Sequence, residues 1–251
     1  MKIVISGYGK MGRMIENIAL KLGHKIVSTV DPKEKSATHK EICPDATKGS
    51  DLIIDFSLPD TALKNIKKAV ECKANMVMGT TGWYKNEKEA RKIVGKKIGF
   101  IFAPNFSLGV NLFACLLEKA TQIMDPFREY DIFSYEMHHR RKVDSPSGTA
   151  LLLGEKVIKN STQKRRLTLD RLNRKIRSDE LHVASIRGGE VPGTHAFVFD
   201  SGFDSIELKH TARSREGWAL GAILAGEWLL KSKKGFFTVN DWLGDILQQD
   251  N

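Results

Sequence analysis

The stretch K-I-V-I-S-G-Y-G-K-M-G at residues 2–12 joins a short apolar run directly to a glycine-rich loop. Residues 2–6 predict a buried strand, and the apolar side chains of residues 11–22 recur at helical spacing until Gly23 ends the helix. Residues 25–30 predict a second strand. A strand–helix–strand unit with glycines at its first turn is typical of the nucleotide-binding half of a Rossmann-type, doubly wound α/β fold.

The glycine loop has the pattern G-x-G-x-x-G, formed by Gly7, Gly9 and Gly12. Such glycines let the backbone approach a pyrophosphate closely, and the first turn of the following helix offers unpaired N–H groups to it. Asp31 follows at the distance of about 20 residues at which a carboxylate bonds ribose hydroxyls. The alternative is a plain strand–turn–helix without a ligand, but the spacing favours a dinucleotide site.

The charges around this loop leave the choice between NAD and NADP open. Asp31 would repel a 2′-phosphate, whereas Lys10, Lys33 and Lys35 would attract one. We therefore expect the protein to use both NADH and NADPH, with some preference for NADH.

The alternation of strands and helices continues along the chain. Strands are predicted at residues 51–56, 75–78 and 98–102, with a helix that opens at Pro59. The segments that follow these strands are F-S-L-P at residues 56–59, G-T-T-G at residues 79–82 and A-P-N-F at residues 103–106. Open parallel sheets bind their ligands at the carboxyl ends of the strands, so we expect the three loops to converge on one crevice.

The pattern changes after a predicted helix at residues 110–124. Strand-like runs then follow with few helices between them, at residues 131–136, 181–187, 195–199 and 205–210. These runs predict a second, inserted α+β domain with an open mixed sheet. An amphipathic helix at residues 217–230 would return the chain to the first domain.

The composition is that of a globular protein, with 251 residues, 41% of them hydrophobic, and a net charge of +10. Residues 156–177 carry much of the positive charge without any aromatic side chain, so we interpret them as a solvated face rather than a nucleic-acid site. No apolar run suits a signal peptide or a membrane span. Cys43, Cys72 and Cys115 are widely spaced, which disfavours disulfides and a cysteine zinc site. We expect a cytoplasmic protein with no nucleic-acid and no membrane partner.

The segment E-M-H-H-R-R-K-V-D-S-P-S-G-T-A at residues 136–150 combines two imidazoles with three cations. His138 and His139 are neighbours, so on an extended segment they point to opposite sides and serve different tasks. The three cations that follow would repel a metal dication, so we expect no metal site here. They should also lower the pKa of His138 in the free protein. A basic surface loop is the alternative interpretation.

A helix start is predicted in the same segment at Ser147. The free backbone N–H groups of Gly148 and Thr149 would face an anion such as a carboxylate. Lys142 would add a point charge, and a substrate with a second carboxylate would also contact His139. The segment therefore predicts a proton donor beside an anion site, which suits a small dicarboxylate substrate.

Residues 136–150 resemble the signature of the 4-hydroxy-tetrahydrodipicolinate reductase family, pyridine-nucleotide enzymes of bacterial lysine and diaminopimelate synthesis. The loop G-Y-G-K-M-G, the segment G-T-T-G and the segment A-P-N-F-S-L-G-V-N are also similar to that family and occur in its order. The resemblance implies that a cyclic imine dicarboxylate is reduced by hydride transfer from NADH or NADPH. It also implies a dinucleotide-binding domain of residues 1–106 and 215–251, and a domain of residues 107–214 that binds substrate and forms a homotetramer through its sheet.

The resemblance further implies roles for single positions. His138 would donate the proton, and Lys142 would assist catalysis. The implied substrate contacts are His139, Lys142, Ser147, Gly148 and Thr149. The implied cofactor contacts are Gly7, Gly9, Lys10, Met11, Gly12, Asp31, Phe56, Gly79, Thr80, Thr81, Ala103, Asn105 and Phe106. Arg141 stands where relatives often carry histidine, and we assign it no catalytic role.

Two other functions use the same features. The first is a nucleotide-sensing binding module, with NAD(H) on the glycine loop and phosphates on the basic face. The second is another dehydrogenase of amino-acid synthesis that acts on an aldehyde or a 2-hydroxy acid. The long motif at residues 136–150 favours the reductase over both.

Overall fold

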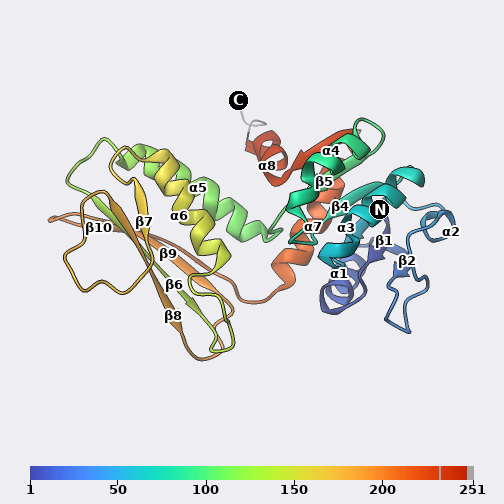
Figure 1. The fold of residues 1–251 in the computed structure, drawn as a ribbon, viewed down its shortest axis with the longest axis horizontal. Coiled ribbons are helices and arrows are strands. Elements are labelled where there is room, and N and C mark those ends of the chain that lie inside the picture. The colour runs from blue at the N-terminus through green and yellow to red at the C-terminus, as the bar shows by residue number, and fades with distance from the viewer. Residues whose placement is uncertain (232, 248–251) are drawn as a thin grey trace. The chain divides into compact units, whose positions relative to one another are not determined.

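The computed structural model describes residues 1–231 and 233–247 (Figure 1). The chain forms two compact units. One combines Met1–Leu108 with the segment that begins at Glu216, and the other is Gly109–Arg215. Within the described residues, no helix is both long and apolar enough to cross a lipid bilayer.

The first unit is built on a sheet of six parallel strands in the order β11-β5-β4-β3-β1-β2. The strands are β1 (Lys2–Ser6), β2 (Lys25–Val30), β3 (Leu52–Asp55), β4 (Asn75–Met78), β5 (Gly99–Phe102) and β11 (Gly235–Thr238). Every residue of β3 and β5 is buried, as expected where helices cover both faces of a parallel sheet. This sheet confirms the predicted Rossmann-type fold.

Helices pack against both faces of this sheet. One face carries α1 (Lys10–Lys21), α7 (Glu216–Leu229) and α8 (Val239–Leu247). The other carries α2 (Pro44–Thr47), α3 (Pro59–Glu71) and α4 (Glu87–Val94), with the short 3-10 helix η1 (Tyr84–Asn86) before α4. Residues of α4 are mostly charged and only Ala90 and Val94 are buried, so its short apolar stripe gives a weak sequence signal.

The order of the strands fixes where a ligand can bind in this unit. β1 lies between β2 and β3, so the chain leaves β1 in one direction to form β2 and returns on the other side to form β3. Doubly wound sheets bind ligands at such a reversal, outside the carboxyl ends of the strands. Gly7 and Phe56 directly follow β1 and β3 at this point.

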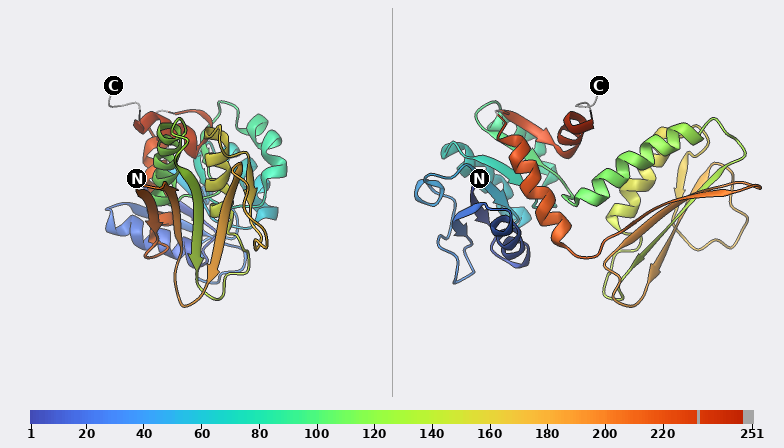
Figure 2. Two further views of the ribbon diagram at one scale, coloured as in Figure 1. Left: turned by 90° about the vertical axis from the view of Figure 1, so that its left-hand side faces the viewer. Right: turned by 180° about the vertical axis from the view of Figure 1, so that it is seen from behind.

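The second unit contains a mixed sheet of five strands in the order β10-β9-β6-β8-β7. The strands are β6 (Asp131–His138), β7 (Arg166–Thr168), β8 (Glu180–Arg187), β9 (Thr194–Asp200) and β10 (Ser205–Thr211). β9 is antiparallel to both of its neighbours, and β8 is parallel to both of its own. Helices α5 (Leu108–Met124) and α6 (Gly148–Asn160) lie on one face, and within the described residues of this unit no helix covers the other (Figure 2). The predicted open mixed sheet is confirmed.

Alternation along β6 determines which side chains point toward the helices. Every second residue from position 132 to position 138 is buried, which includes Glu136 and His138. Strand pairing places Glu136 beside His195 of β9 and Ser185 of β8, and His138 beside Arg187 of β8. A polar group of side chains therefore gathers on the helix-covered face, at the end of the sheet.

The prediction of a solvated face at residues 156–177 is wrong for one of its cations, Lys164, whereas Arg174 is exposed as predicted. Lys164 is buried, and its ammonium group donates to the backbone oxygens of Ser178 and Glu180, each at 2.9 Å. Arg174 donates to the buried carboxylate of Glu180 through two nitrogens, at 2.7 and 2.8 Å. These two cations tie the segment before β8 to the start of that strand.

Candidate active site

The glycine loop of the first unit is shaped by contacts that only glycine permits. Gly7 has a φ of +85°, and a Cβ there would lie 2.2 Å from the backbone oxygen of Phe56. A Cβ on Gly12 would lie 2.3 Å from the backbone oxygen of Gly7. Gly9, by contrast, has no atom within 4 Å of a Cβ position, so the outer side of the loop is open. The loop thus fits a cradle for a group that approaches Gly9 from outside.

A cavity of about 480 Å³ lies at the carboxyl ends of β1, β2 and β3, beside this loop. Four of the predicted cofactor contacts line it: Gly7, Gly9, Asp31 and Phe56. Lys10, Met11 and Gly12 form the first turn of α1, which has no side-chain cap. Backbone N–H groups of an uncapped first turn suit a phosphate.

Asp31 is held by the backbone around it. Its carboxylate accepts hydrogen bonds from the N–H groups of Tyr8 at 3.0 Å, Lys33 at 2.9 Å and Glu34 at 3.0 Å. Burial raises the pKa of Asp31, but these three hydrogen bonds outweigh burial and keep the pKa below its ordinary value. Asp31 is therefore a fixed anion at the rim of the cavity.

A buried carboxylate, that of Asp55, ties together three loops beside the cavity. Asp55 is 0% exposed and accepts hydrogen bonds from the hydroxyls of Ser6 at 2.7 Å, Ser57 at 2.8 Å and Thr80 at 2.6 Å. The amide of Asn65 donates to it at 2.8 Å. Because these partners come from the ends of β1, β3 and β4 and from α3, one side chain links the segments after three strands.

The residues predicted on the nicotinamide side lie in different environments. The Phe56 ring packs directly on Gly79, where a Cβ would lie 2.2 Å from it. Ala103 and Phe106 are buried in the core, at 0% and 1% exposure, so neither offers its side chain to a ligand in this structure. The remaining three are an exposed Thr81, a buried Thr80 and Asn105, whose Oδ1 accepts from the Ser107 N–H at 2.8 Å.

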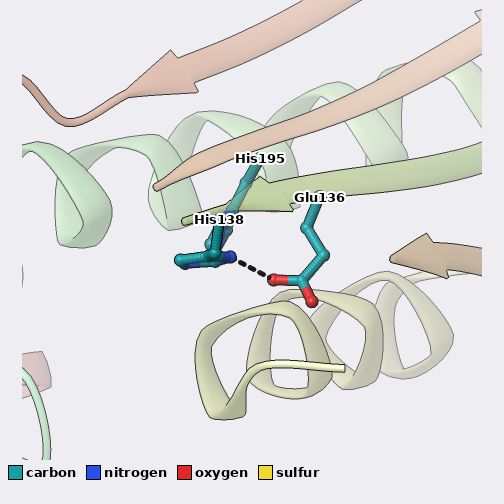
Figure 3. A group of neighbouring side chains, drawn as sticks. All are labelled: Glu136, His138 and His195. Carbon is teal, nitrogen blue, oxygen red and sulfur yellow. Dashed lines mark ion pairs between the residues drawn. The ribbon is translucent and has the colours of Figure 1, made fainter. Parts of the chain in front are cut away.

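His138, at the end of β6 in the second unit, is 8% exposed, and its Nδ1 lies 2.9 Å from Oε2 of Glu136 (Figure 3). The ring of His195 lies on its other side, edge to face, with ring centroids 5.2 Å apart. His139 follows after the strand, and its N–H donates to the Val191 oxygen at 2.8 Å. The structure thus gives the two neighbouring histidines different surroundings.

The cations near His138 are mostly paired. Lys142 contacts Asp144 at 2.8 Å, while Arg141 pairs with Glu190. Burial is the largest cause that lowers the pKa of His138; Lys142 and Arg187 lower it further, and Glu136 raises it. The lowered pKa agrees with the sequence-based expectation, but burial rather than the adjacent arginines is the main reason.

Helix α6 begins at Gly148, where the sequence predicts it. Ser147 is its N-cap, with its hydroxyl accepting from the Ala150 N–H at 3.1 Å. Gly148 is exposed and Thr149 half-buried. The first turn of α6 therefore presents backbone donors at an accessible helix end, as an anion site requires.

One group of described residues has the composition of a metal site. Glu136, His138 and His195 are all buried, and each offers one ligand atom within 4.8 Å of the other two. Arg187 donates to the same carboxylate at 2.7 Å, which places a cation beside the position a metal would take. The expectation that no metal binds here stays a prediction.

Four residues around His138 have no role that the sequence predicts. They are Glu136, at the start of the motif, and Ser185, Arg187 and His195, which lie outside it. The alternation of β6 carries a signal for the first, because positions 136 and 138 share one face of a strand. The other three come from β8 and β9, and their place depends on strand pairing that the sequence does not specify.

Comparison with known proteins decides the family. The profile described as dihydrodipicolinate reductase, N-terminus, matches residues 1–106, and that described as dihydrodipicolinate reductase, C-terminus, matches residues 109–243. The chain belongs to the dihydrodipicolinate reductase family. The resemblance seen in residues 136–150 is thereby confirmed, and with it the assignment to the oxidoreductases.

Two curated relatives match over nearly the whole chain. The 4-hydroxy-tetrahydrodipicolinate reductase of Christiangramia forsetii is 39% identical, with 99% of this chain and 100% of the relative covered. That of Archaeoglobus fulgidus is 36% identical, with 97% and 100% covered.

A solved structure with the same fold is a dipicolinate-bound dihydrodipicolinate reductase from Paenisporosarcina sp. TG-14, with a TM-score of 0.77 at 19% identity over 95% of this chain and 97% of that one. The diaminopimelate dehydrogenase of C. glutamicum has a TM-score of 0.54 at 13% identity, over 100% of this chain and 99% of that one.

Proposed function

We propose that this protein reduces 4-hydroxy-tetrahydrodipicolinate to tetrahydrodipicolinate with NADH or NADPH, in the synthesis of lysine and diaminopimelate. The observation that carries the proposal is the match of both reductase profiles, one to each part of the chain. The first unit holds the nucleotide in the cavity beside Gly9 and Asp31. The second unit binds the dicarboxylate substrate, with His138 as the proton donor.

The nucleotide, when bound, supplies the hydride. The residues of the second unit then have two tasks, because the substrate ring gains negative charge as the hydride arrives. Fixed positive groups such as Lys142 stabilise that charge more in the transition state than in the substrate, which is the condition for faster reaction. His138 holds a proton at a buried position and passes it to the ring.

The substrate carboxylates have matching donors in the second unit. The backbone N–H groups of Gly148 and Thr149 take one carboxylate, with Ser147 fixing the helix end behind them. Lys142 and His139 contact the carboxylates from the loop after β6. The ammonium of Lys142 must exchange Asp144 for the substrate, so binding trades one ion pair for another.

For the cofactor we propose dual use with a preference for NADH. Asp31, a fixed anion in the cavity wall, disfavours a 2′-phosphate. Lys33 and Lys40 line the same cavity and attract a phosphate, while Lys64 is neutralised by Glu41 at 2.9 Å. Steady-state kinetics with both cofactors tests this, and a preference for NADPH above about a hundredfold would overturn it.

We further propose a homotetramer assembled through the open face of the second sheet, in the cytoplasm. Phe133 and Ile186 are 40% and 50% exposed there, and Met137 lies beside Ile186 by strand pairing. Exposed apolar side chains grouped on a sheet mark an interface. Light scattering coupled to gel filtration should give four copies, and Phe133→Glu should give a smaller species. A wild-type monomer would refute the assembly.

The reaction is tested by coupling dihydrodipicolinate synthase to this protein and following the loss of NADH and NADPH absorbance. Pyridine-2,6-dicarboxylate should compete with the substrate. His138→Gln should lower kcat by ~10²–10⁴ while the affinity for NADH is kept. No oxidation of either cofactor by the wild-type protein, or salt-dependent oligonucleotide binding in its place, would refute the reductase function.

A further inference from the structure

Glu136 has no part in the reaction as described above, yet its carboxylate is fully enclosed in the second unit at 0% exposure. Its Oε1 accepts three hydrogen bonds, from the N–H of Ser147 at 2.9 Å, the hydroxyl of Ser185 at 2.9 Å and the guanidinium of Arg187 at 2.7 Å. Its Oε2 faces Nδ1 of His138 at 2.9 Å (Figure 3). The two oxygens therefore have different surroundings: one is filled with donors and the other is directed at the histidine.

These contacts keep Glu136 ionised. Burial alone raises the pKa of this carboxyl, but the hydrogen bonds from Ser147, Arg187 and Ser185 outweigh burial and hold the pKa below its ordinary value. A fixed anion 2.9 Å from Nδ1 favours a proton on that nitrogen through its charge, although the two atoms do not have the geometry of a hydrogen bond.

The other ring nitrogen of His138 is then left for the substrate. A Cβ on Gly193 would lie 3.0 Å from Nε2, so the glycine keeps that nitrogen free of a covering side chain. The ring of His195 stacks edge to face against His138 and limits its rotation. Nε2 is consequently the nitrogen with an accessible side.

We propose that Glu136 is a positioning residue, which fixes one proton of His138 on Nδ1 and so makes Nε2 the donor to the substrate. The same carboxylate accepts a hydrogen bond from the N–H of Ser147, the N-cap of α6. It therefore fixes His138 relative to the expected site for the substrate carboxylate at that helix end. This inference rests on the proposed function for its kinetic consequences.

The proton balance follows from this arrangement. In the transfer step the Nε2–H bond of the imidazolium breaks, and a C–H bond forms at the ring carbon that carries the charge left by the hydride. The electron pair of the broken bond stays on Nε2, and His138 becomes neutral with its remaining proton on Nδ1, facing Glu136. Solvent then returns a proton to Nε2.

The charge on Glu136 also sets how readily His138 is protonated. The ionisable groups that face His138 are Glu136 on its own strand, Lys142 and Asp144 on the following loop, Arg187 on β8 and His195 on β9. Lys142 and Arg187 disfavour the imidazolium and the carboxylates favour it. Removing the charge of Glu136 leaves the cations with less opposition, so His138 would lose its proton at a lower pH.

Glu136→Gln tests the inference without a change of size. The three donors at Oε1 select the amide oxygen for that position, which turns the amide NH₂ toward Nδ1 of His138. A neutral His138 must then accept at Nδ1 and carry its proton on Nε2. Nitrogen-15 NMR of the histidine rings should show Nδ1–H in the wild-type protein and Nε2–H in the variant. Ser185→Ala, which removes one donor from Oε1 and leaves Oε2 in place, should keep the wild-type tautomer.

The kinetic readout separates positioning from support of the fold. Glu136→Gln should lower kcat by ~10²–10⁴ and move the fall of kcat/KM with pH to lower pH, with the affinity for NADH unchanged. In a His138→Gln background the same change should cost no further activity. If Glu136→Gln does not fold, Glu136→Asp keeps the charge with a shorter reach and should show a mixed tautomer and a smaller loss of kcat.

A wild-type tautomer in Glu136→Gln, or full activity in that variant, would overturn the role of Glu136. The two experiments can also disagree. If Glu136→Gln reverses the tautomer of His138 but the wild-type protein does not reduce the dipicolinate precursor, Glu136 still positions His138 and the proposed substrate is wrong. The role of Glu136 and the proposed reaction can therefore be refuted independently of each other.

Discussion

Acid should destabilise this protein through His195, and His195→Gln should remove that part of the effect. The residue lies in β9 and is 5% exposed, paired with Glu136 of β6 and with its ring edge to face against that of His138. Burial lowers the pKa of His195 from 6.5 to about 4. The folded protein therefore keeps this ring neutral over a pH range in which the unfolded chain protonates it.

The size of the effect follows from that difference in pKa. One pH unit of differential protonation corresponds to about 1.4 kcal/mol, so the interval between 6.5 and about 4 contributes about 3 kcal/mol to the free energy of unfolding. The sign is set by the lowered pKa. The contribution is fully present above pH 6.5, falls as the unfolded chain takes up the proton, and is lost by about pH 4.

Urea unfolding at fixed protein concentration, repeated between about pH 7 and pH 4, measures this contribution. The free energy of unfolding of the wild-type protein should fall more steeply with acid than that of His195→Gln, by about 3 kcal/mol over the range. His210→Gln is the matched control, because His210 is only half-buried and its removal should flatten the curve less. Parallel curves for the wild-type protein and His195→Gln would refute the lowered pKa assigned to His195.

Four further outcomes are expected. Gly9→Ala should keep the stability within about 1 kcal/mol, since a Cβ there meets nothing within 4 Å, but should raise the Kd for NADH at least ~10-fold in fluorescence titrations. Gly12→Ala, whose Cβ would lie 2.3 Å from a backbone oxygen, should instead destabilise the fold by about 2 kcal/mol or more in urea unfolding. Lys142→Ala should raise KM for the dicarboxylate by ~10–100-fold. Asp144→Asn should lower this KM, because the ammonium of Lys142 then has no ion pair to give up when the substrate binds. A KM equal to that of the wild-type protein in both variants would contradict the contact between Lys142 and the substrate. Chelators should leave kcat unchanged, and a loss of activity that added Zn²⁺ restores would instead assign a metal to the histidine–glutamate group.

An element of this fold can be predicted from the sequence when its own residues, rather than contacts with distant segments, determine its structure. β1, the glycine loop and α1 were predictable because Gly7 and Gly12 punctuate a strand and a helix of strong apolar periodicity. β11 and α8 were missed, since four half-buried residues and one short helix carry little periodic signal. Their place at the edge of the sheet is set by pairing with β5, far away in the chain.

The candidate site shows the same division. His138, Lys142 and Ser147 lie in one continuous motif, so the sequence was enough to group them. Arg187 of β8 and His195 of β9 reach the same point through strand register, which no local pattern encodes. The burial of Lys164 could not be predicted for a related reason, because a count of charges does not reveal which cation is buried by contacts from residues further along the chain.

The shared carboxylate of Asp55 has a consequence for anyone who wishes to redesign this enzyme. Because Ser6, Ser57 and Thr80 all donate to that one group, substitutions in any of the three loops disturb the other two. Libraries that vary one of these loops at a time will mostly yield misfolded variants. The three loops therefore have to be mutated together. Lys33 and Lys40 at the rim of the cavity are exposed and do not contact Asp55. The preference between NADH and NADPH can therefore be engineered there one position at a time.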